Sequence, residues 1–407
     1  MVEYFDGFGG GGTWNSIAYT QMEFAPLMQL ASLTGIWGIT FLIGWFATLL
    51  FEAVTAPAFT WPRRSFLAFV AVVASAWVFG AFRTHPYFQR DGYTVRTAGI
   101  TYNNAALLKA MYHDAFGAVV DIDEDRLTQN SPELQTLQKG FVRFIENPDS
   151  LKFKITYRAM SRQQDSLLAL AAQEAEAGAR LIVFSEAAFI MPKHMEETFT
   201  QRAAAVASRY HIWLVAGVAA IRTGKIETGK PFIENKLMVW GSEGKLIHTF
   251  YKNKPVPLVE PSIAGDGAVP VIETPFGRMA ISICYDADFP ALMRKAGRQR
   301  ADMLVLPSGD WREIAPYHAR MASVRAIENG FSLVRPVSGA HSIVTNSSGA
   351  VTGDNNFYAA GGKVFVANVP INTRKTLYAN IGDVLPCVCI PVLVALVAYS
   401  FVRRRRS

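Results

Sequence analysis

Three side chains in the middle of the chain together have the chemistry needed for acyl transfer. Glu186, Lys252 and Cys284 each follow a short apolar run that is typical of a buried strand, and loops at strand ends often carry functional residues. A cysteine can act as a nucleophile and a carboxylate as its base. A lysine ammonium can lower the thiol pKa and, with a backbone N–H, stabilise an oxyanion. This set predicts acyl transfer through a cysteine thioester, without a cofactor.

The surroundings of these residues bear on the choice between a functional and a structural cysteine. A single buried cysteine is usually a small hydrophobic residue, so the functional reading depends on Glu186 and Lys252. A second carboxylate, Glu260, lies in a loop stiffened by prolines that begins at Lys252, and this loop is expected to hold both side chains in place. The seven histidines lack the spacing of a metal site, so we predict no metal ligands.

The composition indicates a membrane protein with a polar middle. Half of the 407 residues are hydrophobic and 18% are charged, which is apolar for a soluble protein. The apolar residues concentrate in three runs of about membrane-spanning length, 26–54, 66–82 and 385–402. The net charge of +7 includes Arg403 to Arg406, and we find no basic patch interleaved with aromatic residues. We therefore exclude nucleic-acid binding.

The chain divides into four predicted parts. These are a flexible glycine-rich segment (1–25), two transmembrane helices (26–82), an α/β catalytic domain (83–384), and a transmembrane helix with a basic tail (385–407). Within the domain, helices alternate with strands and strand pairs follow, which predicts layered sheets covered by helices. Residues 103–149 lack a clear period and are predicted to be an insertion, a partly helical lid.

Charges at the membrane runs predict the orientation of the domain. Arg63 and Arg64 lie in the short loop between the first two runs, and Arg403 to Arg406 follow the third. Loops rich in arginine and lysine stay in the cytoplasm. Both ends therefore place the catalytic domain outside the cytoplasm. Two of the three cysteines, Cys387 and Cys389, lie in the last run, so Cys284 is expected to be a free thiol.

The order Glu186, Lys252, Cys284, each at its own strand end, resembles the nitrilase (carbon–nitrogen hydrolase) superfamily. Two further segments are similar to motifs of that superfamily, Arg325 to Gly330 and Asn346 to Gly349. The resemblance implies an α-β-β-α sandwich. Within the superfamily the chain most resembles the apolipoprotein N-acyltransferases, and three segments carry this likeness: Gln29 to Gly38, Tyr251 to Glu260 and Ser308 to Trp311.

That resemblance implies a role for each site residue. Cys284 would carry the acyl group, with Glu186 as base and Lys252 as oxyanion stabiliser. The supporting residues would be Glu260, which orients Lys252, Tyr285 and Asp286, which line the acyl site, and Trp311, which binds substrate. Two features depart from that family: Asp286 stands where it usually has glutamate, and two membrane runs precede the domain where it usually has more.

The implied reaction moves a fatty acyl group from a phospholipid, through the cysteine thioester, to the N-terminal amine of a lipoprotein. The implied location is the bacterial cytoplasmic (inner) membrane, with the domain on the periplasmic side. A membrane-tethered amidase using water as the acceptor would share the same site residues. A third reading is an inactive scaffold that binds lipid or lipoprotein, against which the intact Glu–Lys–Cys set argues.

Overall fold

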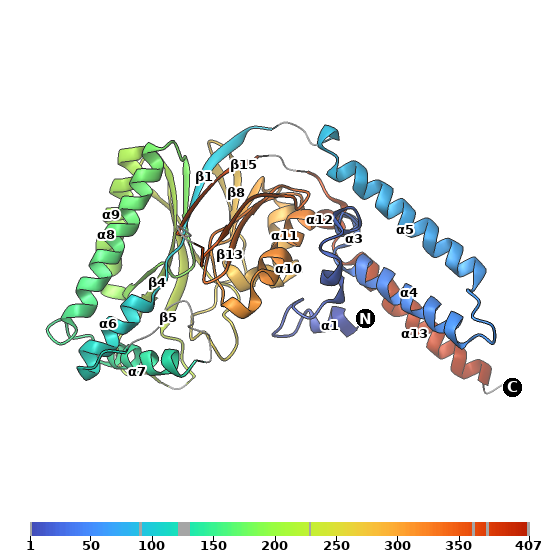
Figure 1. Cartoon of the computed structure of the whole chain (residues 1–407), viewed down its shortest axis with the longest axis horizontal. Helices are drawn as coiled ribbons and strands as arrows, with labels where there is room; N and C mark the ends of the chain where they lie inside the picture. Colours follow the sequence, from blue (N-terminus) through green and yellow to red (C-terminus); the bar gives the residue numbers. More distant parts are fainter. Residues whose placement is uncertain are drawn as a thin grey trace.

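The computed structural model describes residues 2–88, 92–120, 131–227, 229–359, 363–371 and 374–404. An α/β domain lies at one end, and long apolar helices extend from its other side (Figure 1). In the domain, two β-sheets pack face to face and helices cover both outer faces. This is the α-β-β-α sandwich expected from the sequence.

The first sheet has seven strands within the described residues. Along the sheet they run in the order β15 (Val364–Pro370), β1 (Thr94–Ile100), β2 (Leu181–Phe184), β4 (Trp213–Ile221), β5 (Ile233–Trp240) and β6 (Leu246–Tyr251), with β3 (Phe189–Pro192) also paired to β4. β1, β2 and β4 are parallel. The outer face is covered by α8 (Lys154–Glu176) and α9 (Glu196–Tyr210). Because both faces are buried, β2 and β4 are apolar along their whole length.

The second sheet carries the nucleophile candidate. Its order in the described part of the chain is β14 (Val351–Asn356), β13 (His341–Thr345), β11 (Ser332–Arg335), β9 (Met303–Val305), β8 (Gly277–Ile281) and β7 (Val271–Thr274). Its outer face is covered by α10 (Pro290–Arg298) and α11 (Tyr317–Asn329). The short strands β10 (Ser308–Gly309) and β12 (Val337–Ser338) pair beyond β9 and β11. Side chains such as Val183, Val215 and Ile281 fill the core between the two sheets.

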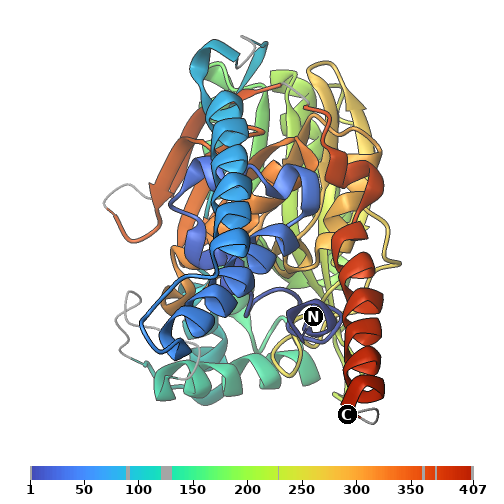
Figure 2. The same ribbon diagram turned by 90° about the vertical axis from the view of Figure 1, so that its right-hand side faces the viewer.

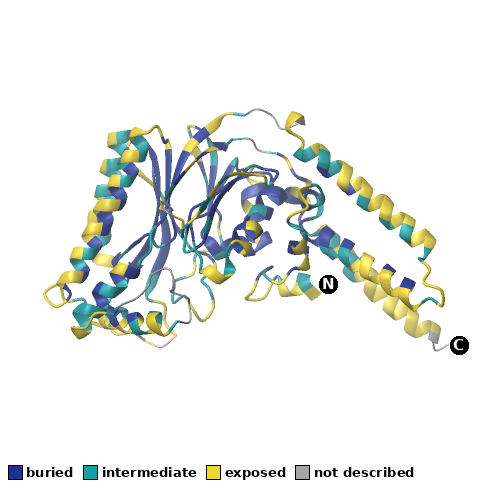
Figure 3. Cartoon of the chain, in the orientation of Figure 1, coloured by how far each residue is buried: buried dark blue, intermediate teal, exposed yellow. Residues whose placement is uncertain are grey.

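Three helices of the described chain are long and apolar enough to cross a membrane, two before the domain and one after it, as predicted. They are α4 (Trp37–Thr55), α5 (Arg63–Thr84) and α13 (Val384–Arg404). Most of their length is exposed (Figure 3), and the exposed side chains include Phe51, Trp77 and Leu396. Such apolar surfaces match the hydrocarbon of a bilayer.

The first membrane helix begins eleven residues later than position 26, where the sequence placed it, because Pro26 to Ile36 fold differently. They contribute to two short helices, α2 (Ala25–Met28) and α3 (Ala31–Thr34), which pack on α5 and α11. Gly35 ends α3 with φ +66, a conformation that glycine adopts readily. Gln29 is fully buried and donates to the Ser348 carbonyl at 2.9 Å. These apolar residues therefore anchor the membrane helices to the catalytic domain.

The glycine-rich N-terminal segment has a defined path, which differs from the flexible lead-in expected from its composition. It contains α1 (Val2–Asp6) and the 3₁₀ helix η1 (Ile17–Gln21), and its start lies beside α13 (Figure 2). Between them, residues 10–15 cross the catalytic domain. We call these residues the N-terminal strap. The Thr13 amide and hydroxyl both donate to the Asp288 carbonyl at 2.9 Å, and the Tyr285 hydroxyl donates to the Gly10 carbonyl.

The predicted insertion at 103–149 contains two helices in its described part, as expected. Residues 121–130 lie outside the described part of the chain. The two helices are α6 (Ala105–Phe116) and α7 (Pro132–Glu146). Both belong to a small apolar cluster with α8, through residues such as Leu107, Phe144 and Met160. The remaining short helices are η2 (Pro86–Phe88), η4 (Lys193–Met195), η5 (Cys284–Asp288), η6 (Arg312–Ile314) and α12 (Leu377–Ile381).

Candidate active site

Cys284 lies on a tight turn just beyond the end of β8. It begins η5 with φ +44, a backbone conformation that is uncommon for residues other than glycine. Such strain is frequent at functional sites. The Cys284 amide donates to the Pro307 carbonyl at 3.0 Å, which joins the turn to the chain beyond β9. The turn presents the thiol to a cavity of about 780 Å³.

Glu186 and Lys252 reach the same cavity from the first sheet. Glu186 follows β2 and Lys252 follows β6, so both leave the sheet at strand ends. Lys252 Nζ lies 2.8 Å from Glu186 Oε1 and 2.6 Å from Glu260 Oε2. The side chains of Glu186 and Lys252 are 8% and 2% exposed. A charged pair so deeply buried requires nearly complete pairing, and these contacts supply it.

Further donors fix the two glutamates. Asn235, within β5, donates through Nδ2 to Glu186 Oε1 at 2.7 Å and to Glu260 Oε1 at 2.6 Å. The Gly309 amide donates to Glu186 Oε2 at 2.8 Å, and the carbonyl of the same glycine lies 3.9 Å from Cys284 Sγ. Gly309 thus contacts both the carboxylate of Glu186 and the thiol.

Burial determines the protonation state of the thiol. Burial, and then the negative charge of Glu186, raise the pKa of Cys284 well above its usual value, although Lys252 acts in the opposite direction. The sequence predicted that Lys252 lowers the thiol pKa; its contribution has that sign, but the net shift is upward. A thiol that is protonated at neutral pH needs a base when it attacks.

Lys252 is held as a cation and Glu260 as an anion. Burial disfavours the ammonium, but the negative charges of Glu186 and Glu260, together with the hydrogen bond to Glu186, outweigh it and raise the pKa of Lys252 well above its usual value. Burial likewise opposes ionisation of Glu260, yet the charge of Lys252 and three hydrogen bonds lower the pKa of that carboxyl. Two of these bonds come from Lys252 and Asn235, and the third from the Val256 amide at 3.1 Å.

Of the remaining predicted residues, Tyr285 and Trp311 line the cavity, whereas Asp286 lies outside its lining. Asp286 is fully buried behind the Cys284 turn. Its Oδ1 accepts from the Lys254 amide at 2.7 Å and its Oδ2 from the Ser282 hydroxyl at 2.9 Å. Burial raises its pKa to about 6. Its contacts join the loop after Lys252 to the turn of the nucleophile, so it acts on the cavity indirectly.

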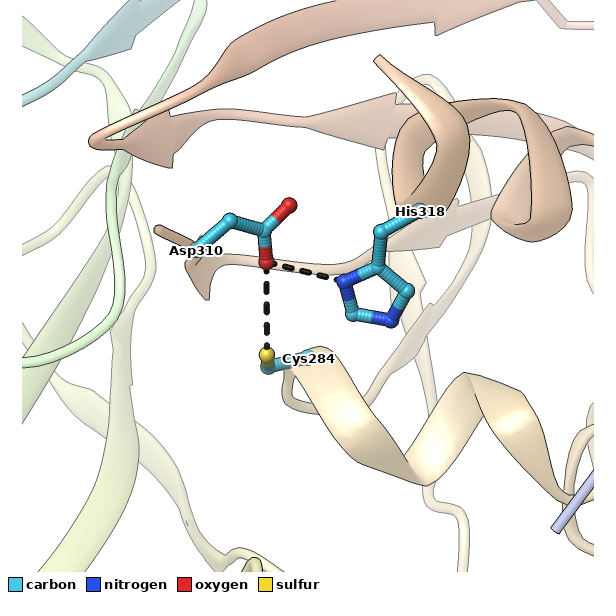
Figure 4. Close-up of side chains that lie close together, drawn as sticks. All are labelled: Cys284, Asp310 and His318. Atoms are coloured by element: carbon cyan, nitrogen blue, oxygen red, sulfur yellow. Dashed lines mark hydrogen bonds and ion pairs between the residues drawn. The ribbon is translucent and has the colours of Figure 1, made fainter. Parts of the chain in front are cut away.

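The sequence reasoning missed a buried polar group on the other side of the thiol. Asp310 Oδ1 lies 3.8 Å from Cys284 Sγ and 2.9 Å from His318 Nδ1 (Figure 4). Arg335 is fully buried and its Nη2 lies 2.9 Å from Asp310 Oδ2. The ligand atoms of Cys284, Asp310 and His318 are close enough together to hold a metal ion. Arg335 already supplies the positive charge at Asp310 and His318, so this set fits an ion-pair network better.

The cavity wall away from the thiol is largely apolar. Its lining comes from α7, from strands of the first sheet and from the loop after Lys252, and includes Phe141, Val142, Ile190, Ile221, Val256 and Val259. The predicted insertion therefore contributes a wall of the cavity through α7. A cavity that is apolar on one side and reactive at one end suits an alkyl chain that ends in a carbonyl group.

Comparison with known families matches both parts of the chain. A family model described as carbon–nitrogen hydrolase matches residues 154–383. A second, described as the apolipoprotein N-acyltransferase N-terminal domain, matches residues 1–49. The first covers most of both sheets together with Glu186, Lys252 and Cys284. The second covers the N-terminal strap and most of α4.

Individual relatives match nearly the whole chain. An apolipoprotein N-acyltransferase from Geobacter metallireducens is 24% identical over 98% of this chain and 71% of its own length. One from Bradyrhizobium diazoefficiens is 26% identical over 97% of this chain and 70% of its own length. Among solved structures, an amidase from Nesterenkonia sp. aligns with a TM-score of 0.48 and 16% identity, over 70% of this chain and 93% of the amidase.

Proposed function

The chain belongs to the carbon–nitrogen hydrolase family, and from that premise we propose that it is a membrane N-acyltransferase. It moves a fatty acyl group from a phospholipid to Cys284 and then to the N-terminal amine of a lipoprotein. The observation that carries this proposal is the match of residues 1–49 to the N-terminal domain of apolipoprotein N-acyltransferases. That segment reaches the catalytic turn through Thr13 and Asp288, so it is part of the site as well as a membrane anchor.

In the first step, Cys284 takes the acyl group from the phospholipid ester. Glu186 accepts the thiol proton while sulfur attacks the ester carbonyl carbon, forming the C–S bond. The C–O bond to glycerol breaks, and the leaving oxygen receives the proton from Glu186. The ammonium of Lys252 faces the oxyanion of the tetrahedral intermediate. Lys252 stays charged throughout because Glu186 and Glu260 both contact it.

In the second step, the amine of the lipoprotein attacks the thioester carbonyl carbon. The C–N bond forms, the C–S bond breaks, and the electron pair returns to sulfur. The proton released by nitrogen passes through Glu186 to the sulfur and restores the thiol. A thioester intermediate divides one difficult transfer into two easier steps.

The apolar cavity and the membrane helices support a lipid donor. Phe141, Val142 and Val259 give the acyl chain an apolar wall, and α4, α5 and α13 anchor the site at a bilayer. We propose further that the catalytic domain faces the periplasm. Arg63 and Arg64 begin α5 at its end remote from the domain, and basic residues of short loops stay in the cytoplasm.

Incubation with a phospholipid bearing one labelled fatty acyl chain tests the proposal. We expect the peptide containing Cys284 to gain the mass of one acyl group, and the group to be released by hydroxylamine, as a thioester is. The Cys284→Ala variant should carry no acyl group, whereas Cys387→Ser, a change in α13, should behave as wild type. A wild-type protein that never carries the acyl group, yet hydrolyses soluble amides, would refute the acyltransferase and support the amidase.

A further inference from the structure

The proposed acyl transfer to Cys284 leaves one group of buried polar residues on the cavity unused. Asp288, Asp310 and His318 line the cavity on the side of the thiol formed by the second sheet and α11. His318 Nε2 donates to Asp288 Oδ1 at 3.1 Å, and its Nδ1 lies 2.9 Å from Asp310 Oδ1. Figure 4 shows the imidazole and the thiol approaching the same oxygen of Asp310. The two carboxylates are thus joined through one imidazole beside the nucleophile.

The charges within this group are balanced. Burial opposes protonation of His318, but Asp310 and Asp288 outweigh it and raise the pKa of the imidazole to about 9. Burial also opposes ionisation of Asp310, yet Arg335 and His318 lower its pKa strongly. His318 is therefore a cation at neutral pH and does not serve as a base. What the group offers to the cavity is its carboxylate oxygens.

One of these oxygens has no partner. Asp288 is 2% exposed, and its Oδ2 is buried without a hydrogen-bond partner among the described residues. Leaving a carboxylate oxygen buried and unpaired is costly, and an unsatisfied group in a site calls for an explanation. An N–H donor entering the cavity would satisfy it.

A second acceptor position is freed when the thiol is acylated. In the free enzyme, Asp310 Oδ1 is within hydrogen-bond distance of Cys284 Sγ, at 3.8 Å. A thioester has no S–H, so this contact of Asp310 is lost once Cys284 carries an acyl group, while His318 and Arg335 keep their contacts with the same oxygen at 2.9 and 3.1 Å. The freed position faces Sγ, the atom to which the acyl carbon is bonded in the thioester.

We propose that Asp288 and Asp310, linked by His318, form the subsite for the N-terminal amine of the acyl acceptor, an inference that rests on the proposed acyl transfer. Asp288 Oδ2 accepts one N–H of the amine and Asp310 Oδ1 a second, which directs the nitrogen lone pair at the thioester carbon. The C–N bond forms, the C–S bond breaks with its electron pair on sulfur, and one of the two N–H protons is transferred to that sulfur, which restores the thiol. Both carboxylates also stabilise the positive charge that develops on the attacking nitrogen.

Asp288→Asn is the sharpest variant for testing this subsite. It retains the size of the side chain and the carbonyl that Thr13 contacts, and an amide oxygen can still accept from His318. At the position of Oδ2 it places an N–H donor where the amine needs an acceptor. Replacing Asp310 would instead leave the fully buried Arg335 without its carboxylate, which is strongly destabilising. Asp165→Asn, on an exposed residue of α8, is the matched control.

The two half-reactions are measured separately, with labelled phospholipid and a synthetic diacylglyceryl-cysteine peptide. The acyl-enzyme is formed first and isolated, and its label is then followed into the peptide or, without peptide, into free fatty acid. We expect Asp288→Asn to slow transfer to the amine by about tenfold or more, the usual loss for a hydrogen bond to a charged group. The fold-loss in the rate of acyl-enzyme formation should be at least about tenfold smaller than the fold-loss in transfer to the amine. The rate at which water hydrolyses the acyl-enzyme should stay within about twofold of wild type.

The outcomes of this experiment distinguish failure of the amine subsite from failure of the proposed acyl transfer itself. Equal losses in amine transfer and in water hydrolysis would mean that Asp288 only supports the Cys284 turn, and would overturn the subsite. Unchanged transfer in Asp288→Asn would do the same, while leaving the acyltransferase intact. If the wild-type protein forms no acyl-enzyme, the proposed function itself fails, whatever the variant does.

Discussion

Gly12→Ala should release the N-terminal strap from the catalytic turn. Gly12 has φ +54, and a Cβ at this position would lie 2.6 Å from the Asp288 carbonyl oxygen. That oxygen belongs to backbone, so it cannot move aside as a flexible side chain can. It also accepts both hydrogen bonds of Thr13. A methyl group at Gly12 therefore removes the contacts that hold the strap beside Cys284.

The size of the effect follows from two terms. A left-handed conformation costs a residue other than glycine about 1–2 kcal/mol, and each of the two lost hydrogen bonds contributes about 1 kcal/mol. Together these shift the local opening free energy of the strap by about 3 kcal/mol, roughly a hundredfold in its opening equilibrium. The global stability should change less, because the two sheets and their cores remain intact.

Hydrogen–deuterium exchange at the Thr13 amide measures this opening. We expect Gly12→Ala to lower the protection of that amide by about a hundredfold, and to speed alkylation of Cys284. Gly11→Ala is the control: it lies in the same glycine tract, but a Cβ there meets no described atom within 4 Å, so protection should stay within about threefold. Equal exchange rates of the Thr13 amide in the two variants would refute the attachment of the strap to the Cys284 turn. They would instead support the flexible segment expected from composition.

Three further predictions concern the charges of the site and the membrane. Glu186→Gln should slow acyl-enzyme formation by about 10²–10⁴-fold, while Lys252 keeps its ion pair with Glu260, and a rate near that of wild type would exclude Glu186 as the base. The His318 pKa is raised from 6.5 to about 9 by Asp310 and Asp288, so its stabilisation is fully present below pH 6.5 and is lost as the pH rises through about 9. The unfolding temperature of wild type should thus fall more steeply between pH 7 and 10 than that of His318→Gln, and parallel curves would contradict the charged imidazole. In oriented vesicles, a protease added on the side of the membrane opposite the cytoplasm should cut the domain between α5 and α13. Full protection of the domain would show that it faces the cytoplasm.

The residues that sequence reasoning found share one local signal. Glu186, Lys252 and Cys284 each stand within three residues of the end of a strand, and loops at strand ends often carry functional residues. Two features of the site have no local signal. Asn235 lies inside β5 between Glu234 and Lys236, and nothing in that position shows that it bridges Glu186 and Glu260. The raised pKa of Cys284 depends on burial, which spacing along the chain cannot reveal.

The group formed by Asp288, Asp310 and His318 was not predicted from the sequence, for a different reason. Asp288 ends the turn that Cys284 begins, Asp310 follows β10, and His318 lies in the first turns of α11. Each position is ordinary for a solvated polar residue, and only the packing of α11 on the second sheet brings them together. The boundary of the first membrane helix was misplaced similarly, because apolar residues that bind lipid and those that bind the domain look alike in sequence. Gly35, where α3 ends, was the local sign of that boundary.

The membrane anchor and the nucleophile are coupled through buried contacts. The Ile36 amide, at the start of α4, donates to Glu328 Oε1 on α11 at 3.0 Å. Arg325, one turn before Glu328, donates to the Tyr19 hydroxyl at 2.8 Å, and that hydroxyl lies 2.8 Å from Thr13 Oγ1. Thr13 in turn holds the carbonyl of the residue that ends the Cys284 turn. A shift of α4 relative to the domain must break one of these buried bonds, and an unpaired buried group is costly. The segment that looked like a loose leader therefore fixes the position of the thiol relative to the membrane helices.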